Sequence, residues 1–112
     1  MPRHISIVFP GQGSQTLGML DPFPKDLVNK YKDDVIEALN FDLIELITNG
    51  TNEELNKSSI TQPAVLLTSF LYYEYISQLL DIKPDLLCGH SLGEYTALLV
   101  GGALKLKDAL SL

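Results

Sequence analysis

Hydrophobic residues follow two different spacings along the chain, and the two spacings predict strands and helices in alternation. Residues 5–9 (ISIVF) and 85–89 (DLLCG) are short apolar runs bordered by Pro or Gly, which is typical of buried strands. Residues 24–40 instead repeat apolar side chains three and four positions apart, which is the period of a helix. Similar reasoning predicts further helices over about 62–80, 92–100 and 104–112.

Capping residues mark where several of these helices begin and end. Pro24 lies near the start of the first helix and Asn40 follows its end, and both residues are common at these helix boundaries. Two short helices are expected next, because a polar capping residue with an acid three positions later is typical of a helix N-terminus. The two pairs are Asp42 with Glu45 and Thr51 with Glu54.

The most apolar region, residues 63–80, contains enough polar side chains to disfavour a membrane span. We therefore expect a mostly buried helix in this region. Thr61 is in position to cap this helix, with Pro63 inside its first turn.

The order of these elements predicts an α/β fold. Two apolar strands separated by helices, with no hairpin signal, favour a parallel sheet. Parallel sheets normally have several strands and are covered on both faces, so two strands are too few. We expect residues 1–112 to form only part of a domain.

Composition and charge narrow the possible partners. The chain has 112 residues, of which 46% are hydrophobic and 20% charged, as in an ordinary globular protein. Its formal charge of −6 argues against binding to nucleic acid or to an anionic membrane. The single cysteine, Cys88, cannot form an internal disulfide, and we predict no metal site. The apolar run before Pro10 is short for a secretory signal, so the expected location is cytoplasmic.

The segment GHSLGEYTAL (89–98) contains a serine between two glycines, directly after a predicted strand and before a predicted helix. The pattern G-x-S-x-G by itself arises by chance in roughly 4% of chains of this length. The order of strand, tight turn and helix is what a nucleophile elbow requires. In such an elbow Ser91 is the nucleophile, and the backbone N–H of Leu92 donates to the oxyanion. The alternative is that Ser91 only caps the helix, with Glu94 completing a capping box.

The loop GQGSQ (11–15) follows the first predicted strand and therefore lies at the same carboxyl edge of the sheet. Its glycines allow backbone N–H groups to approach a ligand closely, so Gln12 could supply a second oxyanion donor. The lysine and the spacing of a phosphate-binding loop are missing. A purely structural turn explains this loop equally well.

Together, FPGQGSQ (9–15), TQPA (61–64) and GHSLGEYTAL (89–98) closely resemble the N-terminal part of malonyl-CoA:acyl carrier protein transacylases of fatty-acid biosynthesis. Acyltransferase domains of polyketide and fatty-acid megasynthases share this pattern. The resemblance extends over essentially the whole chain. It implies an α/β-hydrolase-like domain, with residues 1–112 as its N-terminal segment, and a ferredoxin-like subdomain outside this segment.

The resemblance also implies the chemistry. Ser91 would take the malonyl group from malonyl-CoA and pass it to the phosphopantetheine thiol of acyl carrier protein, with no further cofactor. The backbone N–H groups of Gln12 and Leu92 would form the oxyanion hole, and Gln62 would lie near the site. For Gln62, a plain position in the first turn of a helix is the competing interpretation.

The chain has no evident catalytic base. His90 leaves the backbone in a different direction from its neighbour Ser91, and His4 starts the first strand, roughly 16 Å from the carboxyl edge. Arg3, the one arginine available to bind a malonyl carboxylate, is also at the far end of that strand. The resemblance implies that a histidine and an arginine come from outside these residues, as would the basic surface that docks the acidic carrier protein.

Three hypotheses follow from these observations. The first is a malonyl transacylase or a related polyketide acyltransferase domain. The second is a serine esterase or thioesterase with the same elbow, although the GQGSQ loop differs from the HGGG-type loop of lipases. The third is a non-catalytic fragment, which the missing base would explain.

Overall fold

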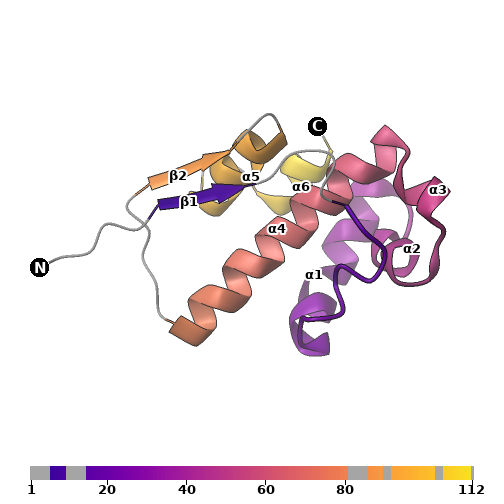
Figure 1. The fold of residues 1–112 in the computed structure, drawn as a ribbon, viewed down its shortest axis with the longest axis horizontal. Coiled ribbons are helices and arrows are strands. Elements are labelled where there is room, and N and C mark those ends of the chain that lie inside the picture. Colours follow the sequence, from indigo (N-terminus) through magenta and orange to yellow (C-terminus); the bar gives the residue numbers. More distant parts are fainter. Residues whose placement is uncertain (1–5, 10–14, 81–85, 90–91, 103–104, 112) are drawn as a thin grey trace, which may run out of the picture.

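The computed structural model describes residues 6–9, 15–80, 86–89, 92–102 and 105–111. Within these ranges the chain forms two strands, the first followed by four helices and the second by two (Figure 1). The elements are β1 (Ser6–Phe9), α1 (Lys25–Leu39), α2 (Leu43–Asn49), α3 (Asn52–Leu55), α4 (Ser58–Leu80), β2 (Leu86–Gly89), α5 (Leu92–Val100) and α6 (Leu106–Leu110). The predicted α/β order is confirmed.

The two strands pair in parallel, as the sequence predicts. Ser6 pairs with Leu86 and Phe9 with Gly89, so both strands end at the same edge of the sheet. Helix α5 packs against both strands and against α4. It therefore connects the sheet to the helical part of the molecule (Figure 1).

The core formed by the described residues lies among the helices. Each described helix contributes apolar side chains to this core, as do Leu20 and Phe23 before α1, and the long α4 crosses the centre of the group (Figure 1). Tyr31 of α1 and Phe70 of α4 meet edge to face, with ring centroids 5.0 Å apart. The apolar residues that are completely buried are Val35, Leu43, Ile47, Ala64 and Leu67.

The predicted caps of the first helices are confirmed. Asn40 ends α1 in the left-handed conformation, at φ 63°, and its N–H donates to the Ile36 carbonyl. Asp42 accepts a hydrogen bond from the Glu45 N–H at 3.1 Å. Residues 51 and 54 form a complete capping box at the start of α3, since each side chain bonds the other residue's backbone N–H.

The prediction for the start of α4 is wrong. The helix begins at Ser58, three residues before Thr61, and Pro63 lies inside the helix rather than in its first turn. Thr61 is completely buried, and its hydroxyl donates to the Leu55 carbonyl at the end of α3. That bond connects α3 to α4. Thr61 therefore makes a buried tertiary contact and does not cap a helix.

Helix α4 is also less buried than the sequence predicts. Residues 64–71 are buried, whereas Leu79 and Leu80 at its C-terminal end are 64% and 65% exposed. The reason is length: α4 has 23 residues, and its second half extends past the other helices (Figure 1). Within the described ranges, no helix has both the length and the apolar character needed to cross a membrane.

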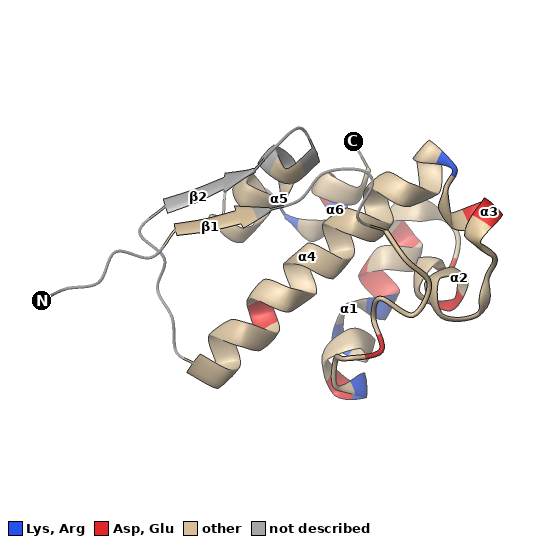
Figure 2. Ribbon diagram, in the orientation of Figure 1, with Lys and Arg blue, Asp and Glu red and all other residues tan. Residues whose placement is uncertain are grey.

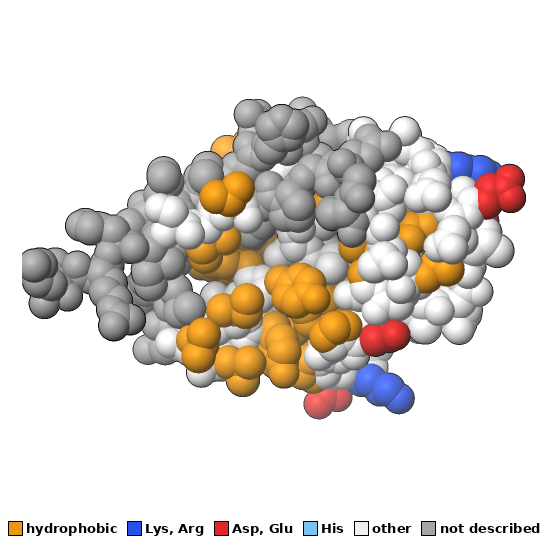
Figure 3. Space-filling model, in the orientation of Figure 1, with side chains coloured by type: hydrophobic (Ala, Val, Ile, Leu, Met, Phe, Trp, Pro, Cys, Tyr) orange, Lys and Arg blue, Asp and Glu red, His pale blue; other side chains and the backbone are white. Residues whose placement is uncertain are grey.

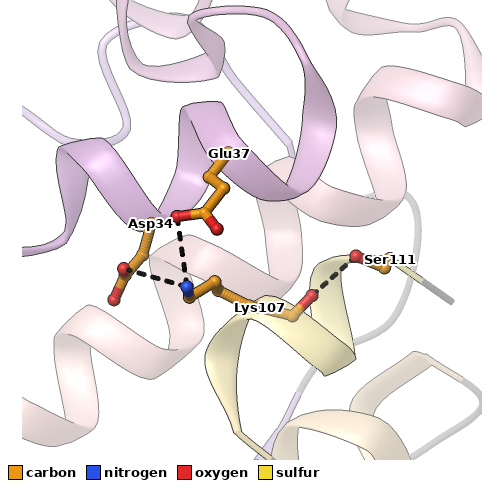
Figure 4. A network of polar contacts seen from close by, with 4 residues as sticks. All are labelled: Asp34, Glu37, Lys107 and Ser111. Atoms are coloured by element: carbon orange, nitrogen blue, oxygen red, sulfur yellow. Dashed lines mark hydrogen bonds and ion pairs between the residues drawn. The ribbon is translucent and has the colours of Figure 1, made fainter.

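Helix α6 packs against α1 through its buried Leu106, Ala109 and Leu110, and a small polar network joins the two helices at the surface (Figure 4). The Lys107 ammonium donates to Glu37 at 3.1 Å and lies 4.0 Å from Asp34. The hydrogen bond and the charge of Glu37 raise the pKa of Lys107 above its ordinary value. Ser111 closes the helix by donating to the Lys107 carbonyl at 2.7 Å. The helix is shorter than the predicted span of 104–112, and residues 103, 104 and 112 lie outside the described residues.

Candidate active site

The strand and helix predicted for a nucleophile elbow are both present. Strand β2 ends at Gly89 and helix α5 begins at Leu92, with two residues between them in the sequence. Those two residues, His90 and Ser91, lie outside the described residues. The structure therefore confirms the elements on either side of Ser91, and its role stays a prediction.

The second predicted oxyanion donor, Gln12, also lies outside the described residues, but the positions around its loop are informative. Because Phe9 pairs with Gly89, the chain leaves both strands from neighbouring points at one edge of the sheet. The last residues of the two strands, Phe9 and Gly89, are therefore neighbours. The role of Gln12 as a second oxyanion donor stays a prediction.

Two contacts hold the last residue of that loop and the chain just after it. The Gln15 side-chain amide donates to the Asn56 side-chain oxygen at 3.0 Å. The backbone N–H of Gly18, at φ 76°, donates to the Ile47 carbonyl at 3.1 Å. The end of the loop is thus attached to the helical part of the molecule. The sequence pattern did not predict the contact between positions 15 and 56, because no local pattern relates residues 41 positions apart.

Leu92, the first predicted oxyanion donor, lies at the start of a helix, and its role stays a prediction. It is the first residue of α5, and the first N–H groups of an α-helix have no partner within the helix. Its backbone N–H is therefore a donor of the kind that binds an anion at a helix N-terminus. One turn further on, Thr96 is completely buried, and its hydroxyl has no hydrogen-bond partner among the described residues.

Gln62 and Thr61, the first residues of the TQPA segment, differ sharply in environment. Thr61 is buried and hydrogen-bonded, whereas Gln62 is exposed. Gln62 lies in the second turn of α4, the helix that packs against α5. Its predicted place near the site stays a prediction.

The sequence predicts that neither histidine serves as the catalytic base and that the arginine does not bind the malonyl carboxylate. His4 and Arg3, like His90, lie outside the described residues. The part of the chain that the structure describes also contains no group of three side chains suited to holding a metal ion.

Comparison with known proteins identifies the family. The pattern of the acyl transferase domain matches residues 7–112, which is nearly the whole chain. The chain belongs to the acyl transferase domain family. The chain also matches the malonyl CoA-acyl carrier protein transacylase of Haemophilus influenzae, with 42% identity over 114 aligned positions. That match covers 98% of this chain and 36% of the relative.

Solved structures of acyl transferases agree with this assignment. An acyl-carrier-protein S-malonyltransferase from Burkholderia pseudomallei is 41% identical and superposes with a TM-score of 0.89, over 96% of this chain and 36% of that protein. A malonyl-transacylase in complex with a type II polyketide synthase acyl-carrier protein is 39% identical, with a TM-score of 0.86, over 96% and 36%. This acyl transferase chain therefore spans about a third of the length of the relatives it matches.

Proposed function

We propose that this chain is the N-terminal part of a malonyl-CoA:acyl carrier protein transacylase of fatty-acid biosynthesis. The observation that carries the proposal is the 42% identity to the Haemophilus influenzae transacylase over 98% of the chain. The parallel strands β1 and β2, followed by α5, support it, because they form the scaffold on which a nucleophile elbow is built. The family domain is α/β-hydrolase-like in this proposal, and residues 1–112 are its first segment.

The reaction proceeds through an acyl-serine in two steps. The hydroxyl of Ser91 attacks the thioester carbonyl of malonyl-CoA, the C–S bond breaks, and coenzyme A leaves as a thiol. The phosphopantetheine thiol of acyl carrier protein then attacks the serine ester and releases Ser91 with its proton restored. The backbone N–H groups of Gln12 and Leu92 stabilise the oxyanion in both steps, and Gln62 lies near the substrate.

This proposal assigns the remaining roles to the rest of the domain. A serine hydroxyl needs a general base near neutral pH, and a malonyl carboxylate is bound well by a bidentate arginine. In Figure 2, α1 carries charges of both signs, whereas α2 and α3 carry acidic residues and no basic ones, so α2 and α3 are poorly suited to bind an acidic carrier protein. The base, the arginine and the docking surface therefore come from the other two-thirds of the enzyme. The cytoplasmic location stays a prediction.

The polyketide alternative differs in the carrier protein that accepts the malonyl group. The 39% identical transacylase bound to a type II polyketide synthase carrier protein supports keeping this alternative. Both alternatives use the same acyl-serine and the same residues of this chain.

The test uses a joined protein: residues 1–112 followed by the remaining sequence of the Haemophilus influenzae relative. With malonyl-CoA and holo acyl carrier protein, we expect the carrier to gain one malonyl group, detected by intact mass. Ser91→Ala should abolish the transfer, and Ser77→Ala, at a serine of α4 away from the elbow, should retain it. Release of free malonate without malonyl carrier would instead support an esterase. Transfer by the Ser91→Ala protein would refute the role of Ser91.

A further inference from the structure

The end of α3 is a point where the GQGSQ loop is attached to the helical part of the molecule. Gln15, the last residue of that loop, donates from its side-chain amide to the Asn56 side-chain oxygen at 3.0 Å. Asn56 is the residue that directly follows α3 and ends it. The surface around α3 shows fewer hydrophobic side chains than the surface over α4 (Figure 3), which suits a contact between two amides.

The backbone of Asn56 is held on both sides. Its own N–H donates to the Asn52 carbonyl at 2.9 Å, and the capping box of residues 51 and 54 closes the other end of the same short helix. The residue before it, Leu55, is 1% exposed and forms part of the core. The exposed side chain of Asn56 is therefore carried by a fixed backbone. A positioning contact requires this, because a mobile partner would not fix the loop.

The end of α3 also holds the TQPA segment. The buried hydroxyl of Thr61 donates to the Leu55 carbonyl, and Gln62 is the next residue after Thr61. Leu55 thus bonds the segment that contains Gln62, and its neighbour Asn56 bonds the loop that contains Gln12. Both segments carry residues that the proposed reaction uses. The end of α3 therefore connects two segments that are far apart in the sequence.

Covalent geometry links Gln12 to these contacts. Gln12 lies three residues after Phe9 and three residues before Gln15 in the sequence. The pairing of Phe9 with Gly89 holds one side of this stretch, and the bond to Asn56 holds the other. Three residues of chain span at most about 11 Å, so the two held residues limit where the residue between them can lie.

We propose that Asn56 is a positioning residue for malonyl transfer. Through Gln15 it holds the loop that presents the backbone N–H of Gln12 to the oxyanion. The inference rests on the proposed function, because it requires Gln12 to be an oxyanion donor. Loss of the hydrogen bond should slow the formation of malonyl-Ser91. It should leave the stability of the fold nearly unchanged, because the bond lies at the surface.

The size of the effect follows from what the substitution leaves in place. Removing an oxyanion donor outright typically lowers the rate by about 100- to 1000-fold. Here the donor remains and loses one restraint, while the bond from the Gly18 N–H to the Ile47 carbonyl at 3.1 Å still holds the chain after the loop. The loss should therefore be smaller, about tenfold.

The test is a single turnover of the joined protein described above, mixed rapidly with malonyl-CoA in the absence of carrier protein. Intact mass gives the rate of malonylation and the final fraction of protein that is malonylated. Asn56→Leu removes the acceptor oxygen, and Asn56→Asp keeps an acceptor at the same position. Asn49→Leu is the matched control, because Asn49 ends α2 and its amide makes a similar exposed bond, to Glu45 at 2.8 Å, that does not involve the loop.

We expect Asn56→Leu to lower the rate about tenfold at saturating malonyl-CoA, with the final malonylated fraction unchanged. Asn56→Asp and Asn49→Leu should keep the original rate. A purely structural role would instead lower the final fraction, because unfolded protein does not react, and would leave the rate of the folded protein unchanged. In the Gln15→Leu protein, Asn56→Leu should have no further effect, since the bond is already absent.

An unchanged rate in the Asn56→Leu protein would overturn the inference, as would a lower final fraction at the original rate. An equal loss of rate in the Asn56→Asp protein, or a further loss when Asn56→Leu is added to Gln15→Leu, would also overturn it, because Asn56 would then act by another route. If the unsubstituted joined protein is not malonylated at all, the proposed function fails and this inference fails with it. The two failures are therefore distinguished by the unsubstituted protein.

Discussion

The buried hydroxyl of Thr96 gives the sharpest test of how α5 is packed. This residue is completely buried, and no described residue forms a hydrogen bond with its Oγ1. The change Thr96→Val removes the hydroxyl and keeps the shape of the side chain. We predict that the variant is more stable than the original chain, which is unusual for a substitution in a core.

The magnitude follows from the desolvation of the hydroxyl. A buried polar group without a partner costs about 1–3 kcal/mol relative to one in water. The unfolding entropy of a 112-residue chain is about 235 cal/mol/K, at about 2.1 cal/mol/K per residue, so each kcal/mol raises Tm by about 4 °C. We therefore expect Tm to rise by at least about 4 °C.

Thermal and urea unfolding followed by circular dichroism measure this change. The matched control is Thr68→Val in α4, because Thr68 is also buried but its hydroxyl donates to the Ala64 carbonyl at 2.8 Å. That control should be neutral or slightly destabilising. If Thr96→Val lowers the free energy of unfolding as much as a lost hydrogen bond does, then the hydroxyl has a partner and our account of α5 packing is wrong.

The remaining predictions concern helix ends and surface charge. Thr51→Ala removes the hydroxyl that accepts from the Glu54 N–H at 3.1 Å and should lower the free energy of unfolding by about 1 kcal/mol; an unchanged urea midpoint would contradict the capping box. Gly102→Ala should cost about 1 kcal/mol through backbone strain alone, since φ is +87° and a Cβ there meets no atom within 4 Å; a stabilised variant would contradict that conformation. Lys107→Met should lose a small, salt-sensitive contribution from Glu37. Because pairing raises the pKa of Lys107, that contribution is complete below the ordinary lysine value and disappears as pH rises through the raised one. Unfolding curves of the variant and the original chain should therefore converge at strongly alkaline pH, and a gap that widens there would refute the pairing.

Local signals were sufficient to predict most of the secondary structure. The capping pair of Asp42 with Glu45 acts within one turn of helix, so short sequence patterns identify it reliably. The parallel pairing of residues 6–9 with 86–89 also followed from the apolar runs and the helices between them. These predictions succeeded because the determining contacts are either within one turn or between two short, strongly apolar segments.

The errors arose where distant contacts decide the outcome. Thr61 has the composition of a cap but instead bonds the Leu55 carbonyl from a buried position inside α4. The exposure of Leu79 and Leu80 was not predicted. Apolar residues in a sequence indicate a surface that packs against something, but they do not identify the residues that it packs against. For the site, the family resemblance was confirmed by the comparisons. The role of Ser91 stays a prediction, because it rests on the chemistry of the motif and Ser91 lies outside the described residues.

The most direct test of the account is to locate the acyl group on the protein. The joined protein is incubated briefly with malonyl-CoA without carrier protein, quenched in acid, digested, and sequenced by tandem mass spectrometry. We predict one malonyl ester, on Ser91, in the peptide that contains GHSLGEYTAL. A malonyl group on any other residue, or equal labelling of the Ser91→Ala protein, would contradict the account.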